Sequence, residues 1–273
     1  MLSLYKGVYR VADMVAQYAL HKKVQLDLNE LESTLRKADV HPFLQPIFDS
    51  QSDKIIGCEV LLRLRENDQY VSPASFIHKL EQTSLINLIT EKLLKKVTDE
   101  IFPYRDALPD DFYFSFNLCA HQIKEIPIVN ALKRFSEVFE DRASLVVEIV
   151  ERKLLEVDEI TACNMDILTN SGIRFAIDDF GAGAASLKYI EHFGFSTLKL
   201  DKDITTTFKG RLAYRKVIMS IVSLAKAAEL TVIAEGVEDE EQMHLLKQAG
   251  VCALQGYHLA SPMDLTRFRQ IFL

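Results

Sequence analysis

Acidic, amide and lysine side chains recur where short apolar segments of this sequence end. Asp178-Asp179 follows the apolar segment 174–177, and Glu235-Gly236-Val237-Glu238 follows 231–234. Further polar residues lie within or just after other apolar segments: Glu59, Arg63, Asn117, Glu148, Glu151, Lys199, Asp201 and Gln255. Buried charge is unfavourable unless it is paired or bound to a metal ion. Any one of these residues could be a paired core carboxylate, but their repetition along the chain predicts a shared site.

Such a cluster would need positive charge, because converging carboxylates repel one another and become protonated. Few basic residues accompany these carboxylates, so metal ions are the natural counter-charge. The candidate ligands are oxygen atoms, with no histidine or cysteine among them, which favours Mg²⁺ or Mn²⁺ over zinc. Asp178 and Asp179 are adjacent at a strand end, so one could bridge two ions while the other reaches the second. Paired ions suit displacement at phosphorus, because they stabilise both the attacking and the leaving oxygen.

Eight apolar segments must bring these residues together, and amphipathic segments that we expect to be helical separate them. The expected strands are 43–48, 55–62, 112–118, 145–150, 174–177, 197–200, 231–234 and 253–257. The expected helices are 86–101, 130–139, 157–171, 186–192, 214–229 and 240–249.

Alternating strands and helices predict an α/β protein with a parallel sheet that is buried on both faces. Eight strands in about 230 residues fit a closed, TIM-like (β/α)8 barrel, whose catalytic groups lie at the C-terminal ends of the strands. An open doubly wound sheet is the alternative, but the chain has no G-x-G-x-x-G turn. Residues 9–38 also have a helical pattern. We expect 1–25 to be a short N-terminal helical extension or linker and 26–273 to be the main domain; a role of the extension in dimerisation is the less favoured alternative.

Composition narrows the possible partners and location. The 273 residues carry a net charge of −7, which argues against a nucleic-acid-binding surface. No apolar run reaches the roughly eighteen residues of a membrane helix, and the N-terminus lacks a signal-peptide core. The four cysteines are widely spaced, so we expect buried, reduced thiols in a cytoplasmic protein or in the cytoplasmic part of a longer one.

The motifs resemble, in order and spacing, those of the EAL domain family, the bacterial phosphodiesterases of cyclic di-GMP. The motif that names the family is present as Glu59-Val60-Leu61, followed by Leu62-Arg63. The other matching blocks are Gln45-Pro46-Ile47, Asn117, Glu148-Ile149-Val150-Glu151, Asp178-Asp179-Phe180-Gly181-Ala182-Gly183, Lys199-Leu200-Asp201, Ala234-Glu235-Gly236-Val237-Glu238, and Gln255-Gly256-Tyr257 with Pro262. The resemblance covers residues 28–265 and rests on many separate blocks.

The resemblance implies hydrolysis of cyclic di-GMP to linear pGpG, with two metal ions per active site activating water. One ion would be held by Glu59, Asn117, Glu148 and Asp178, and the second ion or its waters by Asp178, Asp179 and Glu235. Lys199 would position or help deprotonate the attacking water, and Gln255 would order the same water network; Glu59 and Glu235 complete the catalytic set. Arg63 and Gln45 would contact the phosphate and guanine groups. Further substrate contacts are expected from Leu62, Asp201, Gly236, Gln255 and Pro262. Glu151 would pin the loop that follows strand 174–177.

The sequence departs from the family beside this site. The family's loop usually reads DFGTGYSSL, whereas alanine stands here at 182, 184 and 185. The resemblance implies a homodimer formed near this loop, and the altered loop leaves open a catalytically silent module that binds cyclic di-GMP or a protein partner. Leu64 replaces a usual aromatic residue, and Cys119 replaces a usual serine. A barrel that acts on another phosphate ester is a third possibility.

Overall fold

The computed structural model describes residues 39–66, 69–75, 77–150, 158–181 and 194–273. The chain divides into two compact units. The first comprises the described residues up to His41 together with Leu62–Ile89, and the second comprises Pro42–Leu61 and Thr90–Leu273. The helical pattern expected at 9–38 lies outside the described residues.

The first unit contains the outer end of β2 and several short elements. Strand β3 (Gln69–Val71) pairs antiparallel with β2, with Leu64 opposite Val71 and Arg65 opposite Tyr70. A 3-10 turn, η1 (Pro73–Ser75), and the short helix α3 (Ile77–Leu80) follow. Helix α4 (Leu85–Ile101) begins in this unit and continues into the second.

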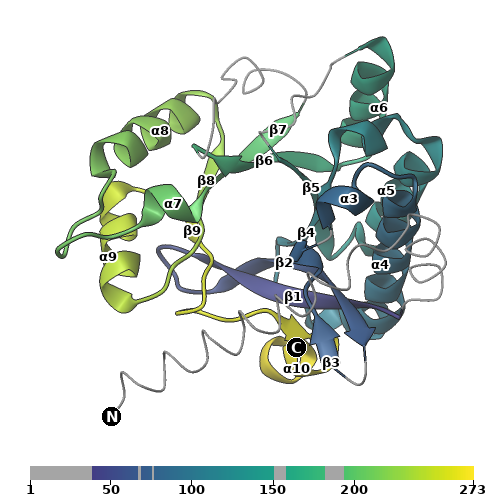
Figure 1. Cartoon of the computed structure of the whole chain (residues 1–273), viewed down its shortest axis with the longest axis horizontal. Coiled ribbons are helices and arrows are strands. Elements are labelled where there is room, and N and C mark those ends of the chain that lie inside the picture. Colours follow the sequence, from purple (N-terminus) through teal and green to yellow (C-terminus); the bar gives the residue numbers. More distant parts are fainter. Residues whose placement is uncertain (1–38, 67–68, 76, 151–157, 182–193) are drawn as a thin grey trace. The chain divides into compact units, whose positions relative to one another are not determined.

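Eight strands form a closed ring in the described part of the chain (Figure 1). They are β1 (Val40–Asp49), β2 (Ile55–Glu66), β4 (Phe112–Leu118), β5 (Ala143–Val150), β6 (Arg174–Phe180), β7 (Phe195–Leu200), β8 (Thr231–Ala234) and β9 (Ala253–Leu254). The ring closes because β1 pairs with both β9 and β2. The predicted eight-stranded barrel is therefore confirmed, although the last strand is shorter than the expected 253–257.

Strand β1 does not follow the expected parallel arrangement. It runs antiparallel to β9, with Phe48 opposite Leu254, whereas β2 and β4 to β9 pair in parallel. The reason is the short connection to β2. The Asp49 amide donates to the Lys54 carbonyl over 2.8 Å, and the Asp49 carboxylate accepts from the Ser52 amide. A turn this tight joins only antiparallel strands, since a parallel pair needs a long crossover. A further strand, β10 (Met263–Asp264), also pairs antiparallel with β1.

The helices that cover the ring agree largely with the predicted ones. They are α4, α5 (Ile126–Phe139), α6 (Glu159–Asn170), α8 (Arg215–Ala227) and α9 (Glu240–Ala249) (Figure 1). Helix α9 has the predicted bounds: Asp239 caps it by accepting from the Gln242 amide, and Gly250 ends it with φ 91°. Helix α5 begins earlier than expected, because Pro127 suits the first turn of a helix. The expected helix 186–192 lies outside the described residues.

Four short elements complete the second unit. They are η2 (Phe102–Ala107), η3 (Ala120–Lys124), α7 (Lys202–Thr205) and α10 (Leu265–Phe272). No helix in the described part of the chain is long and apolar enough to cross a membrane. All four cysteines are free thiols, but only Cys58 and Cys119 are buried. The expectation of burial is wrong for Cys163 and Cys252, whose side chains face solvent.

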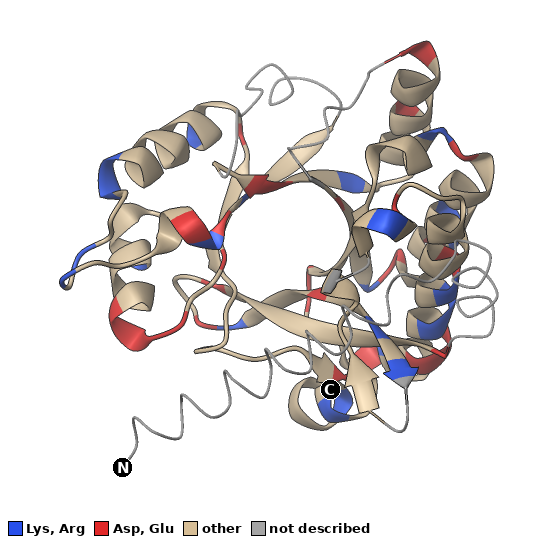
Figure 2. Cartoon of the chain, in the orientation of Figure 1, with Lys and Arg blue, Asp and Glu red and all other residues tan. Residues whose placement is uncertain are grey.

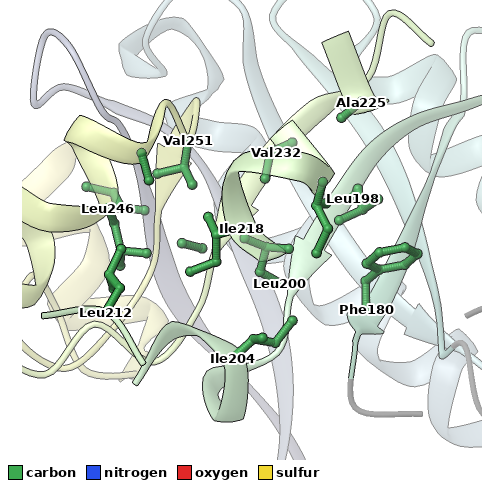
Figure 3. Packing of buried hydrophobic residues seen from close by; sticks show 14 of the residues in the cluster. Phe180, Leu198, Leu200, Ile204, Leu212, Ile218, Ala225, Val232, Leu246 and Val251 are labelled. Atoms are coloured by element: carbon green, nitrogen blue, oxygen red, sulfur yellow. The ribbon is translucent and has the colours of Figure 1, made fainter. Parts of the chain in front are cut away.

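The core between the strands and the outer helices fixes which residues face the barrel interior. Leu198 and Leu200 of β7 pack with Ile218 of α8 and Leu246 of α9 (Figure 3). Because successive strand residues point to opposite faces, Lys199 between the two leucines faces inward. Strand β4 divides in the same way: Phe114 and Phe116 pack against Phe135 of α5. Apolar packing outside the ring thus places polar side chains inside it.

We expect Ile218→Ala to lower the free energy of unfolding by about 2–5 kcal/mol, since it opens a cavity in a fully buried position of this core. Its neighbour Val217 is exposed, so Val217→Ala should change stability by less than about 0.5 kcal/mol. Urea titrations of both variants measure the difference. Equal midpoints for the two variants would contradict the packing of α8 described above.

Candidate active site

The buried ammonium group of Lys199 lies at the centre of an acidic cluster. Its Nζ atom is 2.6 Å from Glu235 Oε1 and 2.7 Å from Glu148 Oε2. Glu59 Oε2 lies 3.2 Å away and Asp178 Oδ1 3.5 Å away. These carboxylates come from β2, β5, β6 and the residue that follows β8. The closed ring therefore brings together residues that are far apart in the sequence.

Two amide side chains orient Glu59 within this cluster. Asn117 Nδ2 donates to Glu59 Oε1 over 2.6 Å, and Gln255 Nε2 donates to Glu59 Oε2 over 2.8 Å. The strand register explains the proximity, because Glu59 lies opposite Ser115 and Asn117 lies opposite Glu148. The sequence-predicted residues Glu59, Asn117, Glu148 and Gln255 thus share one site.

A second acidic group lies at the end of β6. Oxygen atoms of Asp178, Asp179 and Glu235 lie within 4.8 Å of one another. Adjacent strand residues normally diverge, but the β6–β7 register shifts between Ile177 and Phe180, and Asp179 has a left-handed backbone with φ 55°. Such an irregularity can re-aim a side chain at a strand end. It lets both aspartates contribute to the same cluster, and Figure 2 shows an acidic segment of β6 on the wall of the ring.

Four carboxylates share one lysine in this site. Lys199 contacts Glu59, Glu148, Asp178 and Glu235, and Asp179 joins Asp178 and Glu235 in the second acidic group. Burial and the neighbouring carboxylates raise the pKa of Glu235 to about 8, in spite of Lys199. Burial likewise raises the pKa of Glu148 well above its ordinary value.

In Glu59 and Lys199 the neighbouring groups outweigh the effect of burial. Burial alone would raise the pKa of Glu59, but the charge of Lys199 and the hydrogen bonds from Gln255 and Asn117 outweigh it, so this pKa is lowered. Burial alone would lower the pKa of Lys199, yet the surrounding carboxylates raise it well above its ordinary value. Lys199 is therefore held in its charged form.

The arrangement fits divalent cations. The buried Asp178 Oδ1 has no hydrogen-bond partner among the described residues, although it faces the ammonium group of Lys199 at 3.5 Å. An excess of carboxylates, an oxygen-only donor set and an unpartnered buried carboxylate oxygen are what a hard cation requires. The group formed by Asp178, Asp179 and Glu235 could hold one ion, and Glu59, Asn117 and Glu148 lie around the same lysine.

Four residues predicted to contact substrate lie elsewhere in the second unit, namely Gln45, Asp201, Gly236 and Pro262. Gln45 Nε2 donates to the Ala260 carbonyl over 3.4 Å, and the Asp201 carboxylate accepts from the Asp203 amide at the start of α7. Gly236 has φ 67°, and an added Cβ would lie 2.5 Å from Lys202 Cβ, so only glycine fits. Pro262 precedes β10.

Leu62 and Arg63 belong to the first unit, where Arg63 Nη1 donates to the Leu62 carbonyl over 2.7 Å. Glu151 and the loop 182–193 lie outside the described residues.

Two residues near the site were not predicted from the sequence. Thr205 Oγ1 donates to the Glu235 carbonyl over 2.7 Å, and Gln242 Nε2 donates to the Gly236 carbonyl over 3.0 Å. Both lie in helices rather than at strand ends, so an inspection of strand ends overlooks them. The sequence does hold a signal for Gln242, because this residue falls on the same face of α9 as the buried Leu246 and Ala249.

The sequence blocks and the barrel point to one family, and a family model of the EAL domain matches residues 28–262. This chain belongs to the EAL domain family. Among its curated relatives, the cyclic di-GMP phosphodiesterase PdeL of Escherichia coli K12 is 31% identical over 236 residues, which make up 86% of this chain and 65% of PdeL. The probable cyclic di-GMP phosphodiesterase PdeG of the same organism is 29% identical and matches over 89% of this chain and 48% of its own length. This EAL chain therefore spans less than two thirds of these relatives.

Solved structures agree with the family assignment. The phosphodiesterase PaMucR in complex with c-di-GMP superposes with a TM-score of 0.77 at 26% identity, covering 88% of this chain and 98% of that one. An EAL enzyme with bound cAMP and cyclic di-GMP superposes with a TM-score of 0.79 at 27% identity, covering 98% and 72% respectively.

The acidic site predicts a pH-dependent stability for the metal-free EAL protein. The pKa of Glu235 is raised from 4.5 to about 8, so the folded chain retains a proton that the unfolded chain releases. Its stabilising contribution is fully present below pH 4.5 and is lost as the pH rises through about 8. Glu148 contributes in the same direction. We expect the melting temperature in EDTA to fall across this range and Glu235→Gln to flatten the decline. A matched change at the exposed Glu137, Glu137→Gln, should leave the profile unaltered; an unaltered profile in Glu235→Gln would contradict the prediction.

Proposed function

We propose that this EAL domain is a metal-dependent phosphodiesterase that hydrolyses cyclic di-GMP to linear pGpG, which would lower the messenger level in bacterial signalling. The observation that carries the proposal is the buried cluster of carboxylates around Lys199, joined by Asn117 and Gln255. Relatives named as cyclic di-GMP phosphodiesterases support the substrate, as do solved EAL structures that contain cyclic di-GMP.

Two ions, Mg²⁺ or Mn²⁺, would be held by this set of residues. Glu59, Asn117, Glu148 and Asp178 would hold one, and Asp178, Asp179 and Glu235 would hold the other. Ions bound there would stabilise charge on the phosphate oxygens and make the attacking water more acidic. The assignment is supported because divalent cations would offset the repulsion between the carboxylates that converge in this site.

Lys199 would act directly on the attacking water. Its ammonium group is buried and points to the centre of the cluster, so it can hold a water or a phosphate oxygen by a charged hydrogen bond. Ions bound to these carboxylates would offset the charges that raise the pKa of Lys199, and a lower pKa would favour the neutral amine, which can accept a proton from water. Gln255 would order the same water through its side-chain oxygen, which is buried without a partner among the described residues.

Substrate contacts would come from residues around the cluster. Gln45 and Arg63 would contact the phosphate and guanine groups, and further contacts would come from Leu62, Asp201, Gly236 and Pro262. Glu151 would pin the loop after β6, and the region of that loop would form a homodimer interface. We further propose a cytoplasmic location, an N-terminal extension at 1–25 and a catalytic domain at 26–273.

Turnover of cyclic di-GMP with saturating Mg²⁺ or Mn²⁺ tests the proposal. We expect wild-type protein to form pGpG, and Glu59→Ala and Lys199→Ala to lower the rate by at least about 100-fold, since each removes a group that acts on the water or its ion. Lys226→Ala changes an exposed lysine of α8 and should retain the wild-type rate. Chromatographic quantification of pGpG measures all four proteins.

Wild-type protein that forms no pGpG in either metal would overturn the proposal. Tight binding of cyclic di-GMP without product would instead identify a silent binding module. Activity on other cyclic or linear dinucleotides, with none on cyclic di-GMP, would identify a different phosphodiesterase.

A further inference from the structure

Hydrogen bonds fix the backbone of Glu235 and of the residues that follow it. The Glu235 amide donates to the Leu200 carbonyl, and its carbonyl accepts from Thr205 Oγ1 at 2.7 Å. Two residues later, the Val237 amide donates to the Gln255 carbonyl over 3.1 Å. The carboxylate of Glu235 therefore projects from a backbone whose position is set by several neighbouring elements.

The buried side-chain amide of Gln242 in α9 forms hydrogen bonds with this segment and with α7. Its Nε2 atom donates to the carbonyls of Gly236 and Thr205, each at 3.0 Å. Its Oε1 atom accepts from the Glu238 amide at 2.8 Å. The side chain is 5% exposed, and both of its polar atoms are thus used within the protein.

The side chain of Gln242 forms more hydrogen bonds than the capping of α9 requires. Asp239 already caps α9 by accepting from the Gln242 amide, and the contact of Gln242 with the Glu238 amide adds a second capping interaction. Its two donated bonds instead reach α7 and the segment after β8, neither of which belongs to α9. They connect the chain that follows Lys199 with the chain that follows Glu235.

We propose that Gln242 is a positioning residue for the ion site. By fixing Gly236 against Thr205, it places the Glu235 carboxylate beside Asp178 and Asp179, where their oxygens lie within 4.8 Å of one another. Gln242 thereby determines the affinity of this cluster for a divalent cation, without touching the cation. This inference rests on the ion site of the proposed function, but not on the identity of the substrate.

Mn²⁺ binding to the purified chain, measured by calorimetry well below the melting temperature, tests the role. Gln242→Met keeps the length of the side chain but removes its hydrogen bonds, and we expect Mn²⁺ to bind roughly 10–100-fold more weakly, the usual effect of losing a residue that orients a metal ligand. Gln248→Met is the matched control, because Gln248 lies exposed on the same helix and bonds only to His244 among the contacts described.

Thr205→Val provides a second, independent variant, since it removes the hydroxyl that holds the Glu235 carbonyl and nearly keeps the side-chain shape. We expect weaker Mn²⁺ binding here as well, and a double variant whose loss is smaller than the two single losses combined. If Gln242→Met does not fold, Thr205→Val carries the test alone.

A lower melting temperature with wild-type Mn²⁺ affinity in these variants would overturn the inference and leave Gln242 a purely structural residue. Wild-type protein that binds no Mn²⁺ would overturn it too. A third outcome separates the two proposals. If the wild-type protein binds Mn²⁺ and the variants bind it more weakly, but the wild-type protein cleaves no cyclic di-GMP, this inference is supported while the proposed function is refuted.

Discussion

The ammonium group of Lys199 makes it possible to bury several carboxylates at one end of this barrel. Four carboxylates approach it within 3.5 Å, and burial without a counter-charge would protonate them or drive them apart. Burial raises the pKa values of Glu148 and Glu235, and Lys199 offsets this only in part, whereas Lys199 together with the hydrogen bonds from Gln255 and Asn117 lowers the pKa of Glu59. The surrounding barrel therefore holds together carboxylates that would otherwise repel one another.

The barrel can hold such a site because its two faces have separate tasks. Outside the ring, Leu198, Leu200 and their helical neighbours form an apolar layer that supplies stability. Inside the ring, the alternate residues are free to be polar, and their positions follow from strand register rather than from their own attractions. The repulsion between the carboxylates is thus opposed by the apolar packing outside the ring, to which these carboxylates do not contribute.

Much of this could be predicted from the sequence, because apolar segments of the right length mark the strands and the residues at their ends mark the site. The bounds of α9 agree with the predicted 240–249, and in the structure Asp239 caps this helix and Gly250 ends it. The direction of β1 could not be predicted from its apolar pattern, since that pattern is the same for either direction. The turn after Asp49 decided it. The left-handed backbone of Asp179 and the bonds of Gln242 also escaped prediction, because both depend on how distant segments meet.

The reversed direction of β1 determines at which end of the barrel this strand starts. Since β1 runs opposite to β9, the part of β1 that begins at Pro42 starts at the end of the barrel where the other strands finish, which is the end that carries the acidic cluster. The hairpin after Asp49 thus gives β1 the opposite polarity to the strands that carry the acidic cluster, whereas an all-parallel barrel would start β1 at the end away from that cluster.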